Sequence, residues 1–125
     1  MKAMFSIKPR YVEQILLGNK TYEFRRRIFK RTDVDTLVIY STLPQGAVVA
    51  EAHIDGILKS SPNKIWRQTH KYGGMSKSEF MKYFEGSSLA FAIRLGNVRR
   101  FKTPLPLKDY SEKIARPPQS FTYID

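Results

Sequence analysis

The sequence contains no cysteine. Disulfides, thiolate metal sites and cysteine nucleophiles are therefore excluded, and the composition suits a reducing, cytoplasmic environment. The two histidines, His53 and His70, lie far apart in the chain, and neither has a second ligand at metal-binding spacing. We predict no metal site and no other cofactor.

Long apolar runs are also missing. No run approaches the ~20 apolar residues that span a membrane, and the first few residues are followed at once by Lys8 and Arg10. A signal peptide needs an apolar segment at this place. We therefore expect neither a membrane partner nor secretion.

Acidic residues are scarce. The chain has 11 Asp and Glu against 22 Lys and Arg, which gives a formal net charge of +11, and its pI is close to 10.0. A pI above about 9 is typical of nucleic-acid-binding domains, although basic domains also contact membranes or other anionic partners. We expect RNA or a nucleotide as the partner, with DNA as an open alternative and the oligomeric state undetermined.

The apolar residues are sufficient for one ordered domain over residues 1–125. They make up 42% of the 125 residues, and 13% of the residues are aromatic, which is enough to build a core. The pattern predicts strands at 4–7, 21–27, 36–40, 47–58, 89–95 and 98–101. A tight turn at Gly96-Asn97 is expected between the last two strands, and the tail from Thr103 is expected to run extended over the surface to the 121–124 segment. Most successive strands lack crossover helices, so we predict an α+β fold with a curled, mostly antiparallel sheet or small barrel.

Three helices are marked by their ends. Pro9 suits a first helical turn and Gly18 ends that helix. Ser61-Pro62 begins the second helix, and a capping box from Ser76 to Glu79 begins the third. One apolar stripe of the third helix is assigned to the core: Phe80, Tyr83 and Phe84.

Alternation assigns the faces of two strands. In the strand at 21–27, Tyr22 and Phe24 are expected in the core, whereas Glu23, Arg25 and Arg27 lie on the opposite face. In the strand at 47–58, one face is apolar and the other polar. The apolar face carries Val48, Ala50, Ala52 and Ile54, and the polar face carries Glu51, His53 and Asp55.

The densest functional signal is the segment from Lys20 to Arg27, Lys-Thr-Tyr-Glu-Phe-Arg-Arg-Arg. Guanidinium groups bind phosphate bidentately or stack on bases, and Glu23 could orient an arginine or accept a hydrogen bond from a base. The alternative is a solvated polar face with a Glu–Arg pair. Four basic residues between Arg25 and Lys30 favour a binding site, because packing alone rarely accounts for charged residues.

The same segment resembles ASCH domains (activating signal cointegrator homology), which belong to the PUA-like superfamily. The resemblance begins at Ser6-Ile7-Lys8-Pro9 and continues from Ile15 to Arg27 through Gly-Asn-Lys-Thr-Tyr-Glu-Phe-Arg-Arg-Arg. Further similar segments are Val-Ile-Tyr-Ser-Thr-Leu-Pro at 38–44, Val-Ala-Glu at 49–51 and Pro-Pro-Gln-Ser-Phe at 117–121. The last segment is similar to a prokaryotic subgroup often labelled as predicted transcriptional regulators, and the resemblance covers nearly the whole chain.

The resemblance implies a small barrel of five or six mostly antiparallel strands, with one early helix and an inserted helical pair. It also implies a basic cleft between barrel and helices that binds RNA or a modified nucleoside. Lys20, Glu23 and Arg25 would line the cleft floor. The full set of implied nucleic-acid-binding residues is Lys8, Lys20, Thr21, Glu23, Arg25, Arg27, Ser41, Thr42, Gln119 and Ser120.

The resemblance leaves other functions open. Some ASCH proteins are amidohydrolases of acetylated cytidine, thought to use a lysine, a threonine and a glutamate, and others are reported as ribonucleases. Lys20 matches the lysine, but Glu23 stands at the threonine position with Thr21 close by, and Gly73 or Gly74 stands where the acid is expected. In a metal-independent hydrolase of RNA or a modified nucleoside, Glu23 would be the base and Lys20 the stabilising cation. A protein-interaction domain that holds an acidic peptide is the third alternative.

Overall fold

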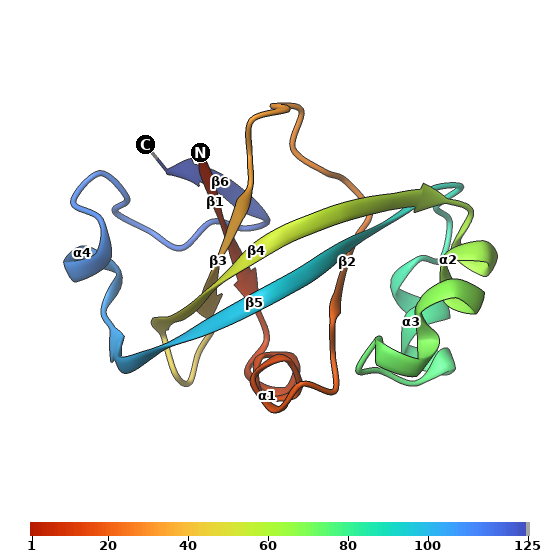
Figure 1. The fold of residues 1–125 in the computed structure, drawn as a ribbon, viewed down its shortest axis with the longest axis horizontal. Coiled ribbons are helices and arrows are strands. Elements are labelled where there is room, and N and C mark those ends of the chain that lie inside the picture. The colour runs from red at the N-terminus through yellow and green to blue at the C-terminus, as the bar shows by residue number, and fades with distance from the viewer. Residues whose placement is uncertain (125) are drawn as a thin grey trace.

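The computed structural model describes residues 1–124. The long strands β4 and β5 lie side by side, and the inserted helices α2 and α3 lie at one end of this pair (Figure 1). The elements in order are β1 (Lys2–Ile7), α1 (Pro9–Leu17), β2 (Tyr22–Arg25), β3 (Thr36–Ser41), β4 (Ala47–Ser60), α2 (Pro62–Thr69), the 3-10 helix η1 (His70–Tyr72), α3 (Lys77–Tyr83), β5 (Ala90–Leu105), α4 (Leu107–Tyr110) and β6 (Phe121–Ile124). Within residues 1–124, no helix is long and apolar enough to cross a membrane.

All six strands belong to one curled sheet in the order β2-β5-β4-β3-β1-β6. Only β1 and β3 run parallel, and every other neighbouring pair is antiparallel. The predicted α+β fold with a mostly antiparallel curled sheet is therefore confirmed. The sheet is a half-barrel rather than a closed barrel, because β2 and β6 form free edges.

Local sequence signals explain the helix ends. Pro9 occupies the first turn of α1, and Gly18 ends the helix with a φ of 85°, a left-handed conformation that glycine adopts without a Cβ clash. At the start of α3, the Ser76 hydroxyl accepts a hydrogen bond from the Glu79 amide, and the Glu79 carboxylate accepts one from the Ser76 amide. At the start of α2, the Ser61 hydroxyl accepts a hydrogen bond from the Lys64 amide. All three predicted helix starts are confirmed.

Two apolar clusters fasten the helices to the sheet. In the larger cluster, Val12 and Ile15 of α1 pack among inward-facing residues of β1, β3, β4 and β5. In the second cluster, Phe24 of β2 packs edge-on against Phe80 of α3 at a centroid distance of 5.0 Å. This second contact holds the inserted helices beside the strand that carries the arginine segment.

Three expectations about strands and faces are wrong. Gly96 and Asn97 form no turn, because β5 runs continuously through them. Between the cross-strand pairs Glu51–Arg99 and His53–Gly96, β5 contains one residue more than β4, which makes a bulge. Asn97 takes a φ of 43°, which a bulge in a continuous strand accommodates as well as a turn does. A second bulge places Val48 in a different apolar cluster from Ala50 and Ala52.

The third correction concerns the tail, which is not simply extended on the surface, since it contains α4 and adds β6 to the sheet, where Phe121 stacks on Phe5 at 5.5 Å. Glu23 lies on the face of β2 opposite Phe24, as the alternation predicts, and is only 6% exposed. Neighbouring elements cover both faces of β2, so alternation alone does not separate core from solvent there.

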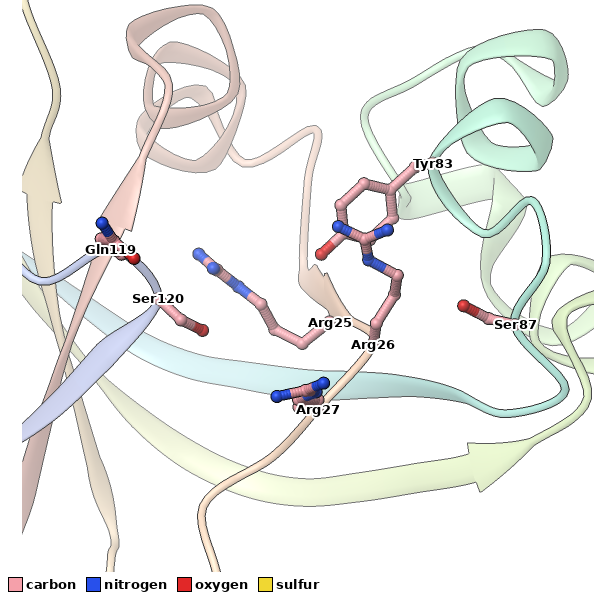
Figure 2. Close-up of a pocket in the computed structure, with 7 residues that line it drawn as sticks. All are labelled: Arg25, Arg26, Arg27, Tyr83, Ser87, Gln119 and Ser120. Atoms are coloured by element: carbon pink, nitrogen blue, oxygen red, sulfur yellow. The ribbon is translucent and has the colours of Figure 1, made fainter.

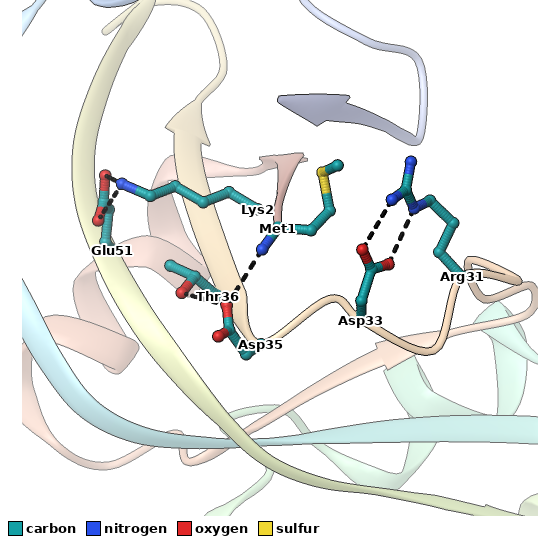
Figure 3. Close-up of polar contacts among 7 residues, drawn as sticks. All are labelled: Met1, Lys2, Arg31, Asp33, Asp35, Thr36 and Glu51. Atoms are coloured by element: carbon teal, nitrogen blue, oxygen red, sulfur yellow. Dashed lines mark hydrogen bonds and ion pairs between the residues drawn. The ribbon is translucent and has the colours of Figure 1, made fainter. Parts of the chain in front are cut away.

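A polar network around Glu51 ties α4 to the strands, and Figure 3 shows its contact with Lys2. The Glu51 carboxylate accepts hydrogen bonds from Lys2 Nζ at 3.0 and 3.1 Å, from Arg99 at 3.2 Å and from the Tyr110 hydroxyl at 2.8 Å. Burial would raise the pKa of Glu51, but the hydrogen bonds from Lys2 and Tyr110 outweigh it and hold that pKa below its usual range. Nearby, the N-terminal ammonium of Met1 lies 3.7 Å from Asp35.

Replacement of Glu51 by glutamine should destabilise the protein in a pH-dependent way. The loss at neutral pH should be about 1–3 kcal/mol, because three donors lose a charged acceptor. The pKa of Glu51 is lower in the folded chain than in the unfolded chain, so its contribution is fully present above about pH 4.3 and disappears as the pH falls through the folded pKa. Chemical denaturation at neutral and acidic pH measures this difference.

The matched control is Glu85→Gln, since Glu85 is exposed. Its effect should stay within about 0.5 kcal/mol at any pH. A Glu51→Gln loss that is the same in acid as at neutral pH would contradict the role assigned to the carboxylate charge.

Candidate nucleic-acid interface

Two adjoining pockets lie where β2, α3 and the C-terminal segment approach one another. The first has a volume of about 630 Å³ and is rich in arginine (Figure 2). Tyr83 and Ser87 lie on its helical side, and Gln119 and Ser120 lie on the opposite side. Its lining residues are Arg25, Arg26, Arg27, Tyr83, Ser87, Gln119 and Ser120, and none of these described residues is acidic.

The second pocket, of about 480 Å³, mixes aromatic, basic and acidic groups. It shares Arg25 and Tyr83 with the first pocket, so the two form one groove. Its lining residues are Ser6, Ile7, Lys8, Arg10, Tyr11, Glu23, Phe24, Arg25, Met75, Glu79, Lys82 and Tyr83.

Arg25 forms the wall between the pockets. Its Nε donates a hydrogen bond to Glu23 Oε2 at 3.0 Å, and its Nη2 donates one to the Ser6 carbonyl at 2.9 Å. Nη2 also lies 2.8 Å from the same Glu23 oxygen in an ion pair. The guanidinium also lies 4.8 Å from the ring centroid of Phe5. Glu23 and Ser6 therefore hold this cation in one orientation, and its Nη1 group makes no hydrogen bond or ion pair within residues 1–124.

Lys20 lies behind the groove. Its ammonium donates to the Gly73 carbonyl at 2.7 Å and is 3.9 Å from Glu23 Oε1, and its side chain is fully buried. Burial lowers the pKa of Lys20 from 10.5 to about 8, although the Glu23 carboxylate acts in the opposite direction. Gly74 packs on the stem of Lys20, because a Cβ at Gly74 would come within 2.7 Å of it.

Arg26 and Arg27 extend beyond the end of β2 and are exposed. The Arg26 guanidinium lies 5.0 Å over the Tyr83 ring, a cation–π contact that Figure 2 shows beside the first pocket. Tyr83 is itself held edge-on against Phe84 at 4.8 Å. Arg27 lines the same pocket.

Ser6 brings the C-terminal segment to the groove. Its hydroxyl donates to the Pro118 carbonyl at 2.6 Å, and its amide donates to the Ser120 carbonyl at 3.4 Å. Because the Ser6 carbonyl also accepts from Arg25, one residue of β1 aligns both sides of the first pocket.

The structure gathers part of the predicted site. The predicted residues that line the groove are Lys8, Glu23, Arg25, Arg27, Gln119 and Ser120. Lys20 and Thr21 do not line it: Lys20 is buried, and the backbone of Thr21 bonds Tyr72 and Leu95. Ser41 and Thr42 lie at the end of β3, where the Thr42 amide donates to the Ile7 carbonyl. The Ser41 hydroxyl is buried and has no hydrogen-bond partner among the described residues.

Several groove residues were not singled out from the sequence. Tyr83 was assigned to the core, but its ring faces both pockets and it is only partly buried. Tyr83 is the last residue of α3, directly before the helix cap, and this position could have indicated from the sequence that its ring is not fully buried. Arg10, Tyr11 and Glu79 also line the second pocket, where the Tyr11 hydroxyl donates to Glu79 at 2.9 Å and Arg10 pairs with Glu79 at 3.2 Å. Burial and the neighbouring Glu79 carboxylate raise the pKa of Tyr11.

Comparison with known proteins gives one consistent result. The profile of the ASCH domain matches residues 5–114. An ASCH domain-containing ribonuclease of Zymomonas mobilis is 31% identical over 125 residues, which cover 98% of this chain and 84% of the relative. The large ribosomal subunit protein uL22 of Ureaplasma parvum is 26% identical over 99 residues, which cover 77% of this chain but only 31% of that protein.

The solved structures agree with the fold. The crystal structure of ASCH from Zymomonas mobilis has a TM-score of 0.89 and 30% sequence identity, and the match covers 99% of this chain and 87% of that chain. A serine-to-alanine variant of ZmASCH has a TM-score of 0.90 at 29% identity, with 99% and 88% coverage. The half-barrel and its helices are thus shared over nearly the whole length.

The burial of Lys20 leads to a test by alkaline pH. The folded pKa of about 8 lies below the 10.5 of an exposed lysine, so the unfolded chain binds more protons between these values and the stability of the fold rises with pH there. A shift of this size corresponds to roughly 3 kcal/mol. In Lys20→Met this rise should be missing, and denaturation of both proteins from pH 7 to pH 10.5 measures it.

Only the difference between the two proteins is informative, since other groups titrate in both. Lys71→Met serves as the control, because Lys71 is exposed and should keep the wild-type pH profile. A difference between wild type and Lys20→Met that stays flat with pH would show that the ammonium is not desolvated.

Proposed function

The chain belongs to the ASCH domain family, and on this premise we propose that it binds RNA along the groove formed by the two pockets. The observation that carries the proposal is the first pocket, which is lined by three consecutive arginines and by no acidic residue among those described. Phosphate contacts supply much of the affinity of proteins for nucleic acids.

The arginine that other residues orient and the arginine that is exposed have different roles in this proposal. Arg25 is oriented by Glu23 and Ser6, so it offers a guanidinium of fixed direction at low entropic cost. Arg27 is exposed and can follow the backbone of a bound strand. Gln119 and Ser120 add polar groups on the opposite side of the pocket.

The choice of RNA over DNA is supported by the relative from Zymomonas mobilis that is named a ribonuclease. The excess of basic residues, +11 in total, supports either nucleic acid. A regulatory role, a cytoplasmic location and a single domain over residues 1–125 stay predictions from the sequence.

RNA cleavage is the second candidate, motivated by the name of the same relative. Metal-independent cleavage needs a base for the ribose 2′-hydroxyl and cations at the phosphate. The arginines could supply the cations, and Glu23 is the predicted base. However, Glu23 already accepts a hydrogen bond from Arg25 Nε and forms an ion pair with Arg25 Nη2 through the same oxygen, and no histidine lines either pocket within the described residues.

The remaining alternatives receive less support. For an amidohydrolase, the predicted Lys20 faces the Gly73 carbonyl rather than the groove, and Gly73 and Gly74 offer no side-chain acid. The positive charge of the first pocket also suits an acidic peptide. A competition experiment between RNA and such a peptide would distinguish peptide binding from RNA binding.

The binding proposal predicts a steep salt dependence that Arg27→Ala reduces. Contact with three or more phosphates should give a log–log slope of affinity against salt steeper than about −2, and the loss of one contact should reduce the slope by about 0.7. Arg27→Ala should weaken binding of a labelled single-stranded RNA by about 3- to 10-fold at low salt. Fluorescence anisotropy over a range of salt concentrations measures both quantities.

Arg67→Ala is the matched control, since Arg67 is also an exposed arginine but lies on α2 outside both pockets. It removes the same charge and should leave affinity and slope close to wild type. Equal losses in the two variants would indicate binding by net charge alone, and a flat salt dependence would end the RNA-binding proposal.

Cleavage is tested with labelled RNA and purified protein in EDTA. We expect wild type and Glu23→Gln to give identical traces without cleavage, because the Glu23 carboxylate is engaged by Arg25. Cleavage by the wild type that Glu23→Gln abolishes would establish the ribonuclease candidate instead. Cleavage by both proteins would point to contamination or to another base.

A further inference from the structure

We propose that one base of the RNA strand held in this groove stacks at the Arg26–Tyr83 pair, while Arg25 and Arg27 hold the adjoining phosphates. This inference rests on the proposed RNA binding and deepens it by naming the two side chains that contact a base. It is carried by the geometry of the first pocket.

Arg26 and Tyr83 both line the first pocket. The guanidinium lies 5.0 Å over the ring, and Tyr83 is held by its edge contact with Phe84 at 4.8 Å. Arg26 is exposed, so its guanidinium is accessible to a ligand. Bases stack on aromatic rings and on guanidinium planes in sequence-tolerant binding of single strands.

The cations beside this pair lie where phosphates of the same strand would follow. Arg25 and Arg27 line the same pocket as Arg26, and Arg25 is aimed by its bonds to Glu23 and the Ser6 carbonyl. The pocket volume of about 630 Å³ falls within the roughly 300–1,000 Å³ of small-molecule sites. The space therefore suits one nucleotide rather than a helix.

A duplex cannot use the stacking surface. Its bases are paired and stacked inside the helix, so a protein reaches mainly phosphates and ribose hydroxyls. The arginines would still attract a duplex, but the Arg26–Tyr83 pair would contribute nothing to its affinity. Stacking thus distinguishes the two RNA classes, whereas charge does not.

The test uses three ligands and three variants of the full chain. The ligands are a single-stranded RNA, an abasic strand of the same length and a duplex, each titrated at one fixed salt concentration. Tyr83→Leu removes the ring and Arg26→Lys removes the guanidinium plane but keeps its charge. Tyr83→Phe keeps the ring and serves as the control, and thermal unfolding checks that all three variants are folded.

The wild type should bind the single strand at least about 10-fold more tightly than the abasic strand, and also more tightly than the duplex. Arg26→Lys and Tyr83→Leu should each weaken binding of the single strand by about 5- to 100-fold, with little change for the abasic strand. Tyr83→Phe should bind like the wild type. Because Arg26 is exposed, Arg26→Lys remains a valid test even if Tyr83→Leu unfolds.

Two failures are distinguishable. If all three ligands bind equally and Arg26→Lys changes nothing, the stacking inference is wrong and RNA binding through phosphates stands. If none of the three ligands binds, the proposed function fails and the inference fails with it.

Discussion

The groove depends on the guanidinium of Arg25, which links the edge strand β2 to β1. β2 is a free edge of the half-barrel, and no backbone ladder joins it to β1. Arg25 makes that connection with its side chain, through the Ser6 carbonyl at 2.9 Å and the Phe5 ring at 4.8 Å. Glu23 on the same strand holds the guanidinium in place. Arg25, which separates the two pockets, therefore makes a structural contact, and its remaining hydrogen-bonding groups face the groove.

Around this contact, the basic residues divide into two groups. Lys20 is enclosed by Gly73, Phe24 and Glu23, with its ammonium 4.6 Å from the Phe24 ring, so its charge supports the packing of η1 against β2. Arg26 and Arg27 are exposed beyond the end of the strand. Because a buried charge must be paired and an exposed one need not be, Arg26 and Arg27 are available to the ligand, together with the part of the Arg25 guanidinium that the fold does not engage.

Ser6 couples the two ends of the chain. Its hydroxyl and amide hold Pro118 and Ser120, while its carbonyl holds Arg25. The C-terminal segment consequently belongs to the same site as β2. The family relationship is consistent with this arrangement, since the match to ASCH from Zymomonas mobilis covers 99% of the chain. The roles of individual residues in the groove follow from their contacts in this structure.

The sequence by itself determined the features that depend on near neighbours. The capping box at Ser76, the end of α1 at Gly18, most of the strands and the importance of the segment from Lys20 to Arg27 all follow from local spacing. Only the tertiary structure decided that Lys20 is buried and that Tyr83 faces the groove. The partner of Lys20 is Gly73, at a separation of 53 residues, and Tyr83 meets Arg26 from a different element. Alternation and periodicity report which side of a strand or helix a residue occupies, but not which distant segment covers that side.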